Sequence, residues 1–271
     1  MIDLDNIELW HGDCLELMKD IPDSSIDLTV TSPPYDNLRS YNGNINQWSF
    51  EKFQEIAKEL YRVIATGGVV VWVVGDSVIN GSETGTSFKQ ALWFKECGFK
   101  LHDTMIYAKE SQPREHNRYE QKFEYMLVFV KGKPKTFNPI KIPCKYAGQK
   151  TSRSCRDDGK DNLKSSSNTI ASEKKKGNIW EYKTGNNCFT SDKIAYKHPA
   201  IFPEQLANDH IISWSNEGDT IFDPFMGSGT TGKMAVLNNR KFIGIELDDT
   251  YFEIAKERIN KANYIQDGDT N

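Results

Sequence analysis

The 271-residue chain is expected to fold as an α/β protein with a doubly wound, mostly parallel sheet and a loop-rich insertion. Three observations predict this fold. Short apolar runs alternate along the chain with amphipathic stretches of helical spacing. The run Val69–Val74 is apolar without interruption, as a strand buried on both faces of a parallel sheet requires. The alternation is lost between residues 132 and 197, so that sheet-forming segments lie on both sides of an insertion.

The segment before the insertion alternates strands with helices. Its expected strands are Ile7–Trp10, Ile26–Val30, Val69–Val74, Leu101–Tyr107 and Phe123–Val130. Its expected helices are Cys14–Lys19, Trp48–Ala65 and Ser87–Cys97. In the longest helix Phe53, Ile56 and Leu60 recur at helical spacing, and Thr66-Gly67-Gly68 is predicted to end it.

The insertion carries the positive charge of the chain. Lys131–Lys197 contains 16 Lys and Arg against 6 Asp and Glu, a net charge of +10, whereas the whole chain carries −4 and the remainder therefore −14. Such asymmetry predicts a basic surface for a polyanion, and a solvated loop without a partner is the alternative. Trp180, Tyr182 and Phe189 are interpreted as a small hydrophobic core of this region, with contact to the polyanion as the alternative.

The segment after the insertion contains a strand, a glycine turn and a helix start. Ile221–Asp223 is the strand, and the turn Phe225–Gly229 lets the backbone approach a ligand closely. Thr230-Thr231 suits a helix N-terminus, whose free N–H groups favour an anion. Lys241–Glu246 reads as the next strand, and its terminal acid can bind the two hydroxyls of a ribose. Together these features predict a nucleoside-binding βαβ unit.

Thr31-Ser32-Pro33-Pro34-Tyr35 follows the expected strand Ile26–Val30. Each proline fixes its own φ and restricts the residue before it, so the backbone is stiff here. Proline also lacks an N–H while its carbonyl remains an acceptor. The rigid turn therefore offers acceptors and one aromatic face, which suits a planar group that bears an amine. A proline turn with a surface tyrosine is the alternative.

Two motifs together resemble a known family. Asp223–Thr231, with its Asp-Pro-Phe-x-Gly-Ser-Gly-Thr-Thr pattern, and Ser32-Pro33-Pro34-Tyr35 are similar to the motifs of amino-group DNA methyltransferases that use S-adenosyl-L-methionine. The catalytic motif comes first, as in the β class. Gly12-Asp13-Cys14 resembles the family's segment at the cofactor adenine, and His198–Glu204 resembles the segment that closes over the methionine end. The resemblance covers most of the chain outside residues 132–197.

The resemblance implies a Rossmann-like methyltransferase fold in four parts. These are a catalytic half at 1–131, a target-recognition insertion at 132–197, a cofactor-binding half at 198–263 and a frayed tail at 264–271. Double-stranded DNA is the implied substrate, within a restriction-modification system, and a cognate restriction endonuclease and a homodimer are left open as partners.

The composition indicates where the protein is located and argues against a membrane protein, a disulfide-rich protein and a metal-binding protein. The chain is 38% hydrophobic, which is enough for one sizeable α/β core with an insertion. No run approaches the ~20 apolar residues that span a bilayer, and the acidic Met1–Asp5 does not resemble a signal peptide. The five scattered cysteines and the five histidines give neither a disulfide framework nor metal-ligand spacing. We expect a cytoplasmic protein of bacterial, archaeal or phage origin without a membrane partner or a metal.

The proposed chemistry gives roles to the catalytic motif. The Ser32 hydroxyl and the Pro33 carbonyl accept hydrogen bonds from the N–H groups of the exocyclic amine, which frees the lone pair of its nitrogen. Pro34 stiffens the turn, and Tyr35 stacks on a base that has left the duplex. Asp36 and Asp76 are conceivable proton acceptors, although a turn residue and a loop acid are the preferred readings.

The predicted cofactor site gathers residues from both halves. Asp13 would accept the adenine amino group, Glu246 would take the ribose hydroxyls, and Asp223 would attract the cationic amino group of the methionine part. A helix cap at Asp13, an exposed strand end at Glu246 and a plain surface residue at His198 are the alternatives. The full predicted set is Asp13, Cys14, Thr31, His198, Pro199, Phe202, Asp223, Phe225, Gly227, Ser228, Gly229, Thr230, Thr231 and Glu246.

The choice of base depends on Ser32. In the family a carboxylate at this position usually accompanies adenine N6, so the neutral hydroxyl favours cytosine N4. Cytosine C5 methylation would need a thiolate nucleophile, for which Pro143-Cys144 is the candidate, but the order of segments is wrong for that chemistry. RNA or protein amide methylation and a non-catalytic DNA-binding protein are remote alternatives.

Overall fold

The computed structural model describes residues 2–4, 6–34, 48–109, 117–157, 160–183, 188–201 and 203–268. Tyr35, Asp36 and Phe202, for which the sequence predicts roles or alternatives, lie outside the described residues. The chain divides into two compact units, one formed by Met1–Asn138 with Asn178–Asn271 and the other by Pro139–Gly177.

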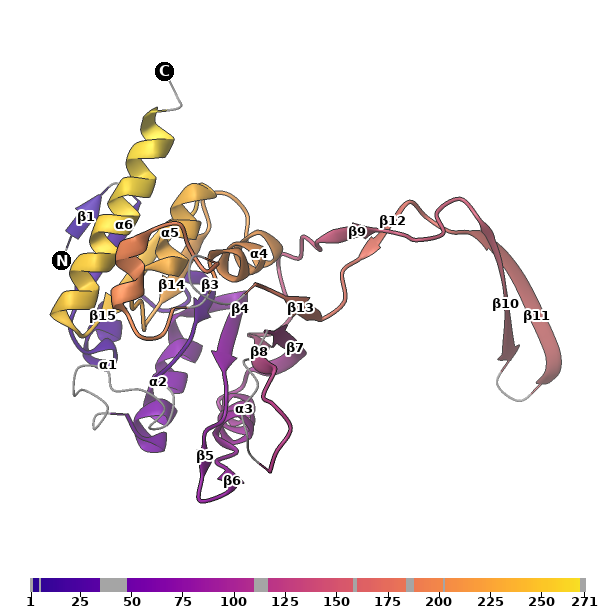
Figure 1. Ribbon diagram of the computed structural model, residues 1–271, viewed down its shortest axis with the longest axis horizontal. Helices are drawn as coiled ribbons and strands as arrows, with labels where there is room; N and C mark the ends of the chain where they lie inside the picture. Colours follow the sequence, from indigo (N-terminus) through magenta and orange to yellow (C-terminus); the bar gives the residue numbers. More distant parts are fainter. Residues whose placement is uncertain are drawn as a thin grey trace. The chain divides into compact units, whose positions relative to one another are not determined.

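The first unit is built on a sheet in which the described residues form nine strands, in the order β1-β2-β15-β14-β3-β4-β8-β7-β13 (Figure 1). The strands are β1 (Ile2–Leu4), β2 (Ile7–His11), β3 (Ile26–Thr31), β4 (Ile64–Val74), β7 (Lys100–Ala108), β8 (Phe123–Val130), β13 (Ile179–Glu181), β14 (Thr220–Asp223) and β15 (Lys241–Glu246). Strands β2, β15, β14, β3 and β4 pair in parallel, and β13 runs parallel to β7. Strand β1 pairs antiparallel with β2, β8 with β4, and β7 with β8. The predicted mostly parallel α/β sheet is confirmed.

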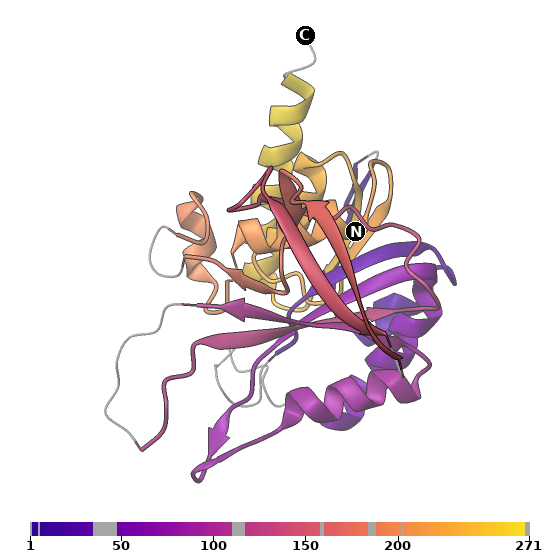
Figure 2. The same ribbon diagram turned by 90° about the vertical axis from the view of Figure 1, so that its right-hand side faces the viewer.

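Helices cover both faces of this sheet (Figure 2). One layer contains α1 (Cys14–Leu17), α2 (Phe50–Val63) and α3 (Thr86–Glu96), and the other contains α4 (Glu204–Trp214), α5 (Thr230–Leu237) and α6 (Asp249–Gly268). A short 3-10 helix, η1 (Met18–Asp20), continues α1 in place of the expected single helix. Helix α6 extends into the predicted tail.

An aromatic cluster holds the first helical layer against the sheet. The ring of Trp72 on β4 lies 5.7 Å from that of Phe53 on α2 and 5.1 Å from that of Phe94 on α3. The Trp72 indole N–H also donates to Gln90 Oε1 at 2.8 Å, so the polar edge of this buried ring is satisfied. The carboxyl end of β4 is thereby fixed to both helices.

Helix α2 ends earlier than the glycines predict. It stops at Val63, and β4 begins at Ile64 before Gly67-Gly68 is reached. The Lys131 ammonium donates to the carbonyls of Tyr61 and Ile64 at 2.7 and 2.9 Å. A distant lysine therefore satisfies carbonyls at the helix end, which local sequence does not reveal.

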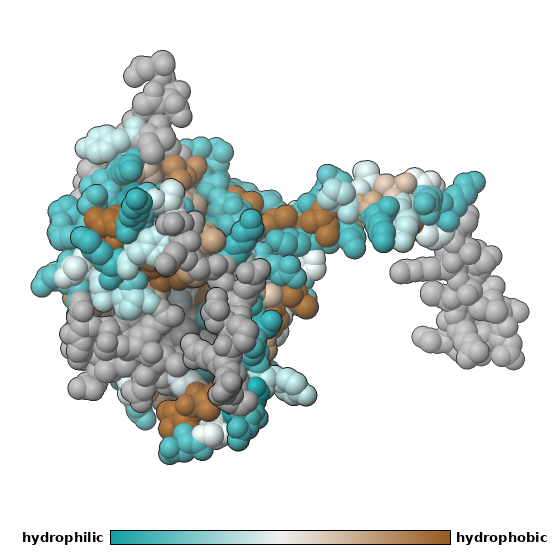
Figure 3. All heavy atoms as spheres, in the orientation of Figure 1, coloured by the Kyte–Doolittle hydropathy of each residue, from teal (hydrophilic) through white to brown (hydrophobic). Residues whose placement is uncertain are grey.

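The second unit is more regular than the predicted loop. Two antiparallel ribbons form there, one from β9 (Lys141–Pro143) and β12 (Glu173–Lys175), the other from β10 (Lys150–Asp157) and β11 (Lys160–Thr169). Ser, Asn and Lys dominate these strands, so the apolar alternation that marks a strand is missing from the sequence. Hydrophilic residues cover most of the described surface of this unit in Figure 3.

The aromatic residues expected as a core of the insertion belong to the first unit. Trp180 on β13 is buried with its ring 4.8 Å from that of His210 on α4. The Tyr182 hydroxyl donates to Asp209 Oδ2 at 2.9 Å. Phe189 is half-buried. The prediction of a separate hydrophobic core is wrong for Trp180 and Tyr182, because β13 joins the edge of the main sheet and packs against α4.

Candidate active site

The two motifs meet at the carboxyl ends of neighbouring strands. Strand β3 ends at Thr31 and β14 ends at Asp223, and these strands pair in parallel. Thr31 Oγ1 donates to Asp223 Oδ1 at 2.6 Å. Ser32 and Pro34 are half-buried and Pro33 is buried. Ligands of open α/β sheets bind at this edge, so the two motifs lie where such a sheet offers a ligand site.

Asp223 is a buried carboxyl group that suits a cation. Burial raises its pKa to about 7, against the opposing effect of hydrogen bonds from the Thr31 hydroxyl and the Phe225 N–H. The Phe225 N–H lies 3.0 Å from Asp223 Oδ1. A carboxyl group with such a pKa ionises readily when a positive charge approaches. The residues therefore fit the amino group of a bound methionine moiety.

The glycine turn has little room for side chains. Gly227 and Gly229 have φ of +53° and +78°, where only glycine is free of strain. A Cβ at Gly227 would lie 3.0 Å from His198 Nε2. His198 is buried, its Nδ1 accepts from the Ala200 N–H at 3.1 Å, and its ring lies 4.3 Å from that of Tyr251. The reading of His198 as a plain surface residue is wrong.

Several predicted cofactor residues have their side chains engaged within the protein. Thr231 Oγ1 donates to the Val30 carbonyl at 3.0 Å. Ser228 and Thr230 are buried, and their hydroxyls lie 3.2 and 3.3 Å from Arg258 Nη1. These hydroxyls stabilise the turn, which leaves the backbone of the turn as the part that can meet a ligand.

Glu246 faces the glycine turn from the end of β15. Its Oε2 accepts from the Gly227 N–H at 2.7 Å and its Oε1 from the Asp248 N–H at 2.9 Å. Burial raises the pKa of this carboxyl group. The interpretation of Glu246 as an exposed strand end is therefore wrong. Each oxygen keeps a second lone pair, which fits two vicinal hydroxyls.

Asp13 caps α1 and also forms an ion pair. Its Oδ1 accepts from the Leu15 N–H at 2.9 Å, and its Oδ2 lies 2.6 Å from Lys52 Nζ on α2. Burial alone would raise the pKa of Asp13, but the bonds from Lys52 and Leu15 outweigh it and hold the pKa below its usual value. The helix-cap reading is confirmed, and it is compatible with a ligand on the remaining lone pairs. Burial raises the pKa of Cys14 to about 12, so this thiol stays neutral.

The remaining predicted residues are placed at the margins of the turn. Pro199 is exposed beside His198. Phe225 is half-buried, with its ring 5.4 Å from Trp48 and 6.0 Å from Trp72. Sequence reasoning placed Trp48 only in a helix, although it lies before α2, and missed Lys52 as the partner of Asp13.

Asp76, a conceivable proton acceptor, is engaged at the start of α3. Asp76 accepts hydrogen bonds from the Ser87 N–H, at 2.9 Å, and from the Ser87 hydroxyl, so it holds the first turn of α3 as a loop acid. Cys144 belongs to the second unit. No helix in the described part of the chain is both long enough and apolar enough to cross a bilayer.

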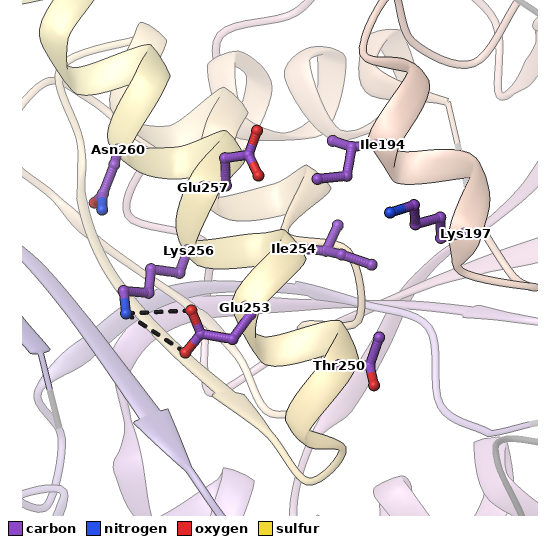
Figure 4. Close-up of a pocket in the computed structure, with 8 residues that line it drawn as sticks. All are labelled: Ile194, Lys197, Thr250, Glu253, Ile254, Lys256, Glu257 and Asn260. Carbon is purple, nitrogen blue, oxygen red and sulfur yellow. Dashed lines mark hydrogen bonds and ion pairs between the residues drawn. The ribbon is translucent and has the colours of Figure 1, made fainter.

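A separate cleft of about 370 Å³ lies between α6 and the 3-10 helix η3 (Lys193–Lys197), as Figure 4 shows. Glu253 and Lys256 pair at 3.2 Å along its α6 side. The lining residues are Ile194, Lys197, Thr250, Glu253, Ile254, Lys256, Glu257 and Asn260. None of the predicted site residues lines this cleft.

Relatives of the chain are DNA methyltransferases. It is 56% identical to the orphan methyltransferase M.BamHII of Bacillus amyloliquefaciens over 92% of this chain and 93% of that protein. It is 30% identical to the DNA adenine methyltransferase YhdJ of Escherichia coli, over 94% of this chain and 83% of that protein.

Solved structures share the fold. A DNA modification methylase of Thermus thermophilus in complex with S-adenosylmethionine matches with a TM-score of 0.62 and 25% identity, over 94% of this chain and 95% of that one. The PvuII DNA methyltransferase, described as cytosine-N4-specific, matches with a TM-score of 0.69 and 20% identity, over 96% and 92%.

A family model described as DNA methylase, of the N6 and N4 type, matches residues 26–257. The described segments of this range include β3, the glycine turn and β15. The family match and the near full-length relatives show that the chain belongs to the N6/N4 amino-group DNA methyltransferases, enzymes that use S-adenosylmethionine.

Proposed function

We propose that the chain transfers a methyl group from S-adenosylmethionine to the exocyclic N4 amine of a cytosine that has left the DNA duplex. The position of Ser32 carries this proposal. It follows directly on Thr31, whose hydroxyl donates a hydrogen bond to Asp223, so an uncharged residue comes directly after the strand end that contacts the carboxyl group proposed to bind the cofactor. A neutral acceptor at this place favours cytosine over adenine.

Acceptors on the chain would activate the amine. Its lone pair is delocalised into the ring, so it is a poor nucleophile. The Ser32 hydroxyl and the Pro33 carbonyl would accept hydrogen bonds from the two N–H groups of the amine and draw its nitrogen towards tetrahedral geometry. S-adenosylmethionine supplies a sulfonium methyl group. The freed lone pair forms the N–C bond as the methyl's bond to sulfur breaks, and the amine proton passes to solvent. Positioning of the reactants supplies much of the rate.

The proposed cofactor site follows the geometry of the turn. Asp223 would pair with the cationic amino group, Glu246 with the ribose hydroxyls and Asp13 with the adenine amino group. The backbone of Gly227–Gly229 would approach the cofactor closely, and Tyr35 would stack on the base. The rest of the proposed site is Cys14, Thr31, Pro34, His198, Pro199, Phe202, Phe225, Ser228, Thr230 and Thr231.

The second unit is proposed to read the target. Pro139–Gly177 contains 10 Lys and Arg against 4 Asp and Glu, a net charge of +6. The exposed side chains of Lys141, Lys174 and Lys175 on the β9–β12 ribbon suit the phosphates of a duplex. The proposal includes double-stranded DNA in a bacterial cytoplasm as the setting. A restriction endonuclease partner and a homodimer remain part of the hypothesis.

Adenine N6 is the second candidate. The 30% identity to an adenine methyltransferase over most of both chains favours it. The same site could serve either amine, because both bases present an exocyclic N–H2 on a flat ring. The two candidates therefore differ in product and not in the mode of activation.

Identification of the product tests the proposal. Unmethylated genomic DNA is incubated with the enzyme and S-adenosylmethionine labelled with deuterium in the methyl group, then hydrolysed to nucleosides for mass spectrometry. Labelled N4-methylcytosine is expected. Labelled N6-methyladenine as the product would overturn the proposed base, and labelled 5-methylcytosine would overturn the amine mechanism.

A further inference from the structure

Arg258 on α6 is a buried cation outside the predicted site. Its side chain is 1% exposed, a position that is costly for a guanidinium unless its charge is paired and its N–H groups meet acceptors. Its Nε lies 3.2 Å from Asp192 Oδ2, and its Nη2 lies 2.7 Å from Glu204 Oε1. Its Nη1 donates to the Ser228 carbonyl and lies 3.3 Å from Thr230 Oγ1. Three separate chain segments therefore meet at one side chain.

Lys233 shares the two carboxylates. Its Nζ lies 2.7 Å from Asp192 Oδ2 and 2.8 Å from Glu204 Oε1. Two cations thus balance two carboxylates, and the Ser228 carbonyl is not needed for charge balance. The Lys233 ammonium contacts the two carboxylates, whereas Arg258 also donates to the backbone of the glycine turn.

The carboxylate partner Asp192 belongs to a strap, residues 188–198, that leads through η3 to His198. The His198 ring lies close to the glycine turn, where a Cβ at Gly227 would meet its Nε2 at 3.0 Å. The cleft between η3 and α6 shows that side-chain packing does not fill the space along the strap (Figure 4). The ion pair of Asp192 with Arg258 is therefore a direct link between the strap and α6.

We propose that Arg258 is a positioning residue that sets the spacing between the strap and the glycine turn, and so the shape of the methionine end of the cofactor site. This inference rests on the proposed cofactor site. The planar fork of the guanidinium can meet a carboxylate and a carbonyl together. A lysine in its place keeps the charge but presents one nitrogen where the guanidinium presents three, so it cannot reproduce the separate contacts to Asp192, Glu204 and the Ser228 carbonyl.

Arg258→Lys, Arg258→Met and the matched control Lys233→Met test the proposal. Calorimetry without DNA gives the Kd for S-adenosylmethionine, steady-state kinetics give KM and kcat, and urea unfolding reports stability. We expect Arg258→Lys to raise the Kd and the KM for S-adenosylmethionine about tenfold, with the KM for DNA within about twofold. Lys233→Met removes a cation from the same carboxylates, and its Kd should rise less than about threefold.

An Arg258→Lys enzyme that binds S-adenosylmethionine within about twofold of the wild type would overturn the proposal. So would a Lys233→Met enzyme that is weakened as much as Arg258→Lys, because the ion cluster would then act through stability alone. If Arg258→Met does not fold, the Arg258→Lys enzyme decides. An adenine product would overturn the proposed base and leave this test unchanged, because the Kd is measured without DNA.

Discussion

Thr31 Oγ1 donates a hydrogen bond to Asp223 Oδ1 over 2.6 Å, although 192 residues separate the two along the chain. A second buried bond, from Thr231 Oγ1 to the Val30 carbonyl at 3.0 Å, joins the same two regions. The end of β3 is therefore bonded on both sides of the glycine turn, to Asp223 before the turn and to Thr231 after it. Movement of one segment would displace the other, so the proposed amine acceptor and cofactor site form one assembly.

Replacement of Thr31 by valine tests this link. Valine keeps the shape but removes a donor from a fully buried carboxyl group, at a cost of about 1–3 kcal/mol. Thr31→Val should weaken S-adenosylmethionine binding at neutral pH by about tenfold, measured by calorimetry. Thr29→Val is the matched control, because Thr29 lies on the same strand and its buried hydroxyl has no hydrogen-bond partner among the described residues. Equal losses in both variants would contradict the role of the Thr31–Asp223 bond.

Cofactor binding should depend on pH through Asp223. Burial raises the pKa of this group to about 7 from a model-compound value of 3.8, so the protonated form dominates in the free enzyme below pH 7. The cationic amino group of S-adenosylmethionine prefers the ionised form. The Kd should therefore rise as the pH falls through 7, and an Asp223→Asn enzyme should bind more weakly with a flat profile. A wild-type profile that is flat between pH 6 and 8 would contradict this assignment.

The same pKa predicts the pH dependence of stability. Because the folded-state pKa is raised, the contribution of Asp223 is fully present below about pH 4 and is lost as the pH rises to about 7. Other groups add their own dependences, so the difference between the wild type and Asp223→Asn is the useful quantity. Urea unfolding of both should show the wild type losing stability relative to the variant across this window.

Gly227→Ala should impair cofactor binding beyond its effect on the backbone. Both Gly227 and Gly218 have a left-handed φ, at which alanine costs about 1–2 kcal/mol. A Cβ at Gly218 meets nothing within 4 Å, whereas one at Gly227 meets His198 Nε2 at 3.0 Å. We expect similar losses of unfolding free energy, but a Kd for S-adenosylmethionine at least about tenfold higher only for Gly227→Ala. Unchanged binding in Gly227→Ala would show that the ligand does not approach the turn.

The ion pair of Lys52 with Asp13 gives a further prediction. Lys52→Met removes a charged hydrogen bond that helps to keep Asp13 ionised and oriented. The Kd for S-adenosylmethionine should rise by about two- to tenfold, whereas the Kd for a cofactor analogue without the adenine amino group should change less. Lys58→Met, on the same helix with its ammonium over the Trp93 ring, is the control. A control that loses as much affinity as Lys52→Met would assign the effect to the helix and not to Asp13.

Sequence reasoning reached the parts of the fold that local patterns encode. Continuous apolar runs and helical spacing predicted β4, α2 and the order of elements around the glycine turn. Contacts between residues that lie far apart in the sequence could not be predicted in this way. The early start of β4 goes with the bond from Lys131 to the Ile64 carbonyl, and β13 joins the sheet through pairing with β7. The β10–β11 ribbon was missed because its polar strands lack an apolar alternation.

In the candidate site, too, only residues marked by a local sequence pattern could be predicted. Glu246 was predicted from its place at the end of a parallel strand, the edge at which such a sheet binds ligands, and Asp223 was predicted from the family motif. Arg258 was missed, because on α6 it follows charged neighbours such as Glu257 and resembles a solvated residue. Its burial depends on Asp192, which lies 66 residues away. No local sequence pattern predicts this ion pair between Arg258 and Asp192.

The single-turnover rate of methyl transfer by Ser32→Ala tests the central claim most directly. Saturating concentrations of enzyme and labelled S-adenosylmethionine separate the chemical step from binding, and the Kd for the cofactor serves as the control for folding. Loss of one of two acceptors on the amine should slow transfer about 100-fold, with an unchanged Kd for S-adenosylmethionine. A Ser32→Ala enzyme that forms N4-methylcytosine at the wild-type rate would contradict the account.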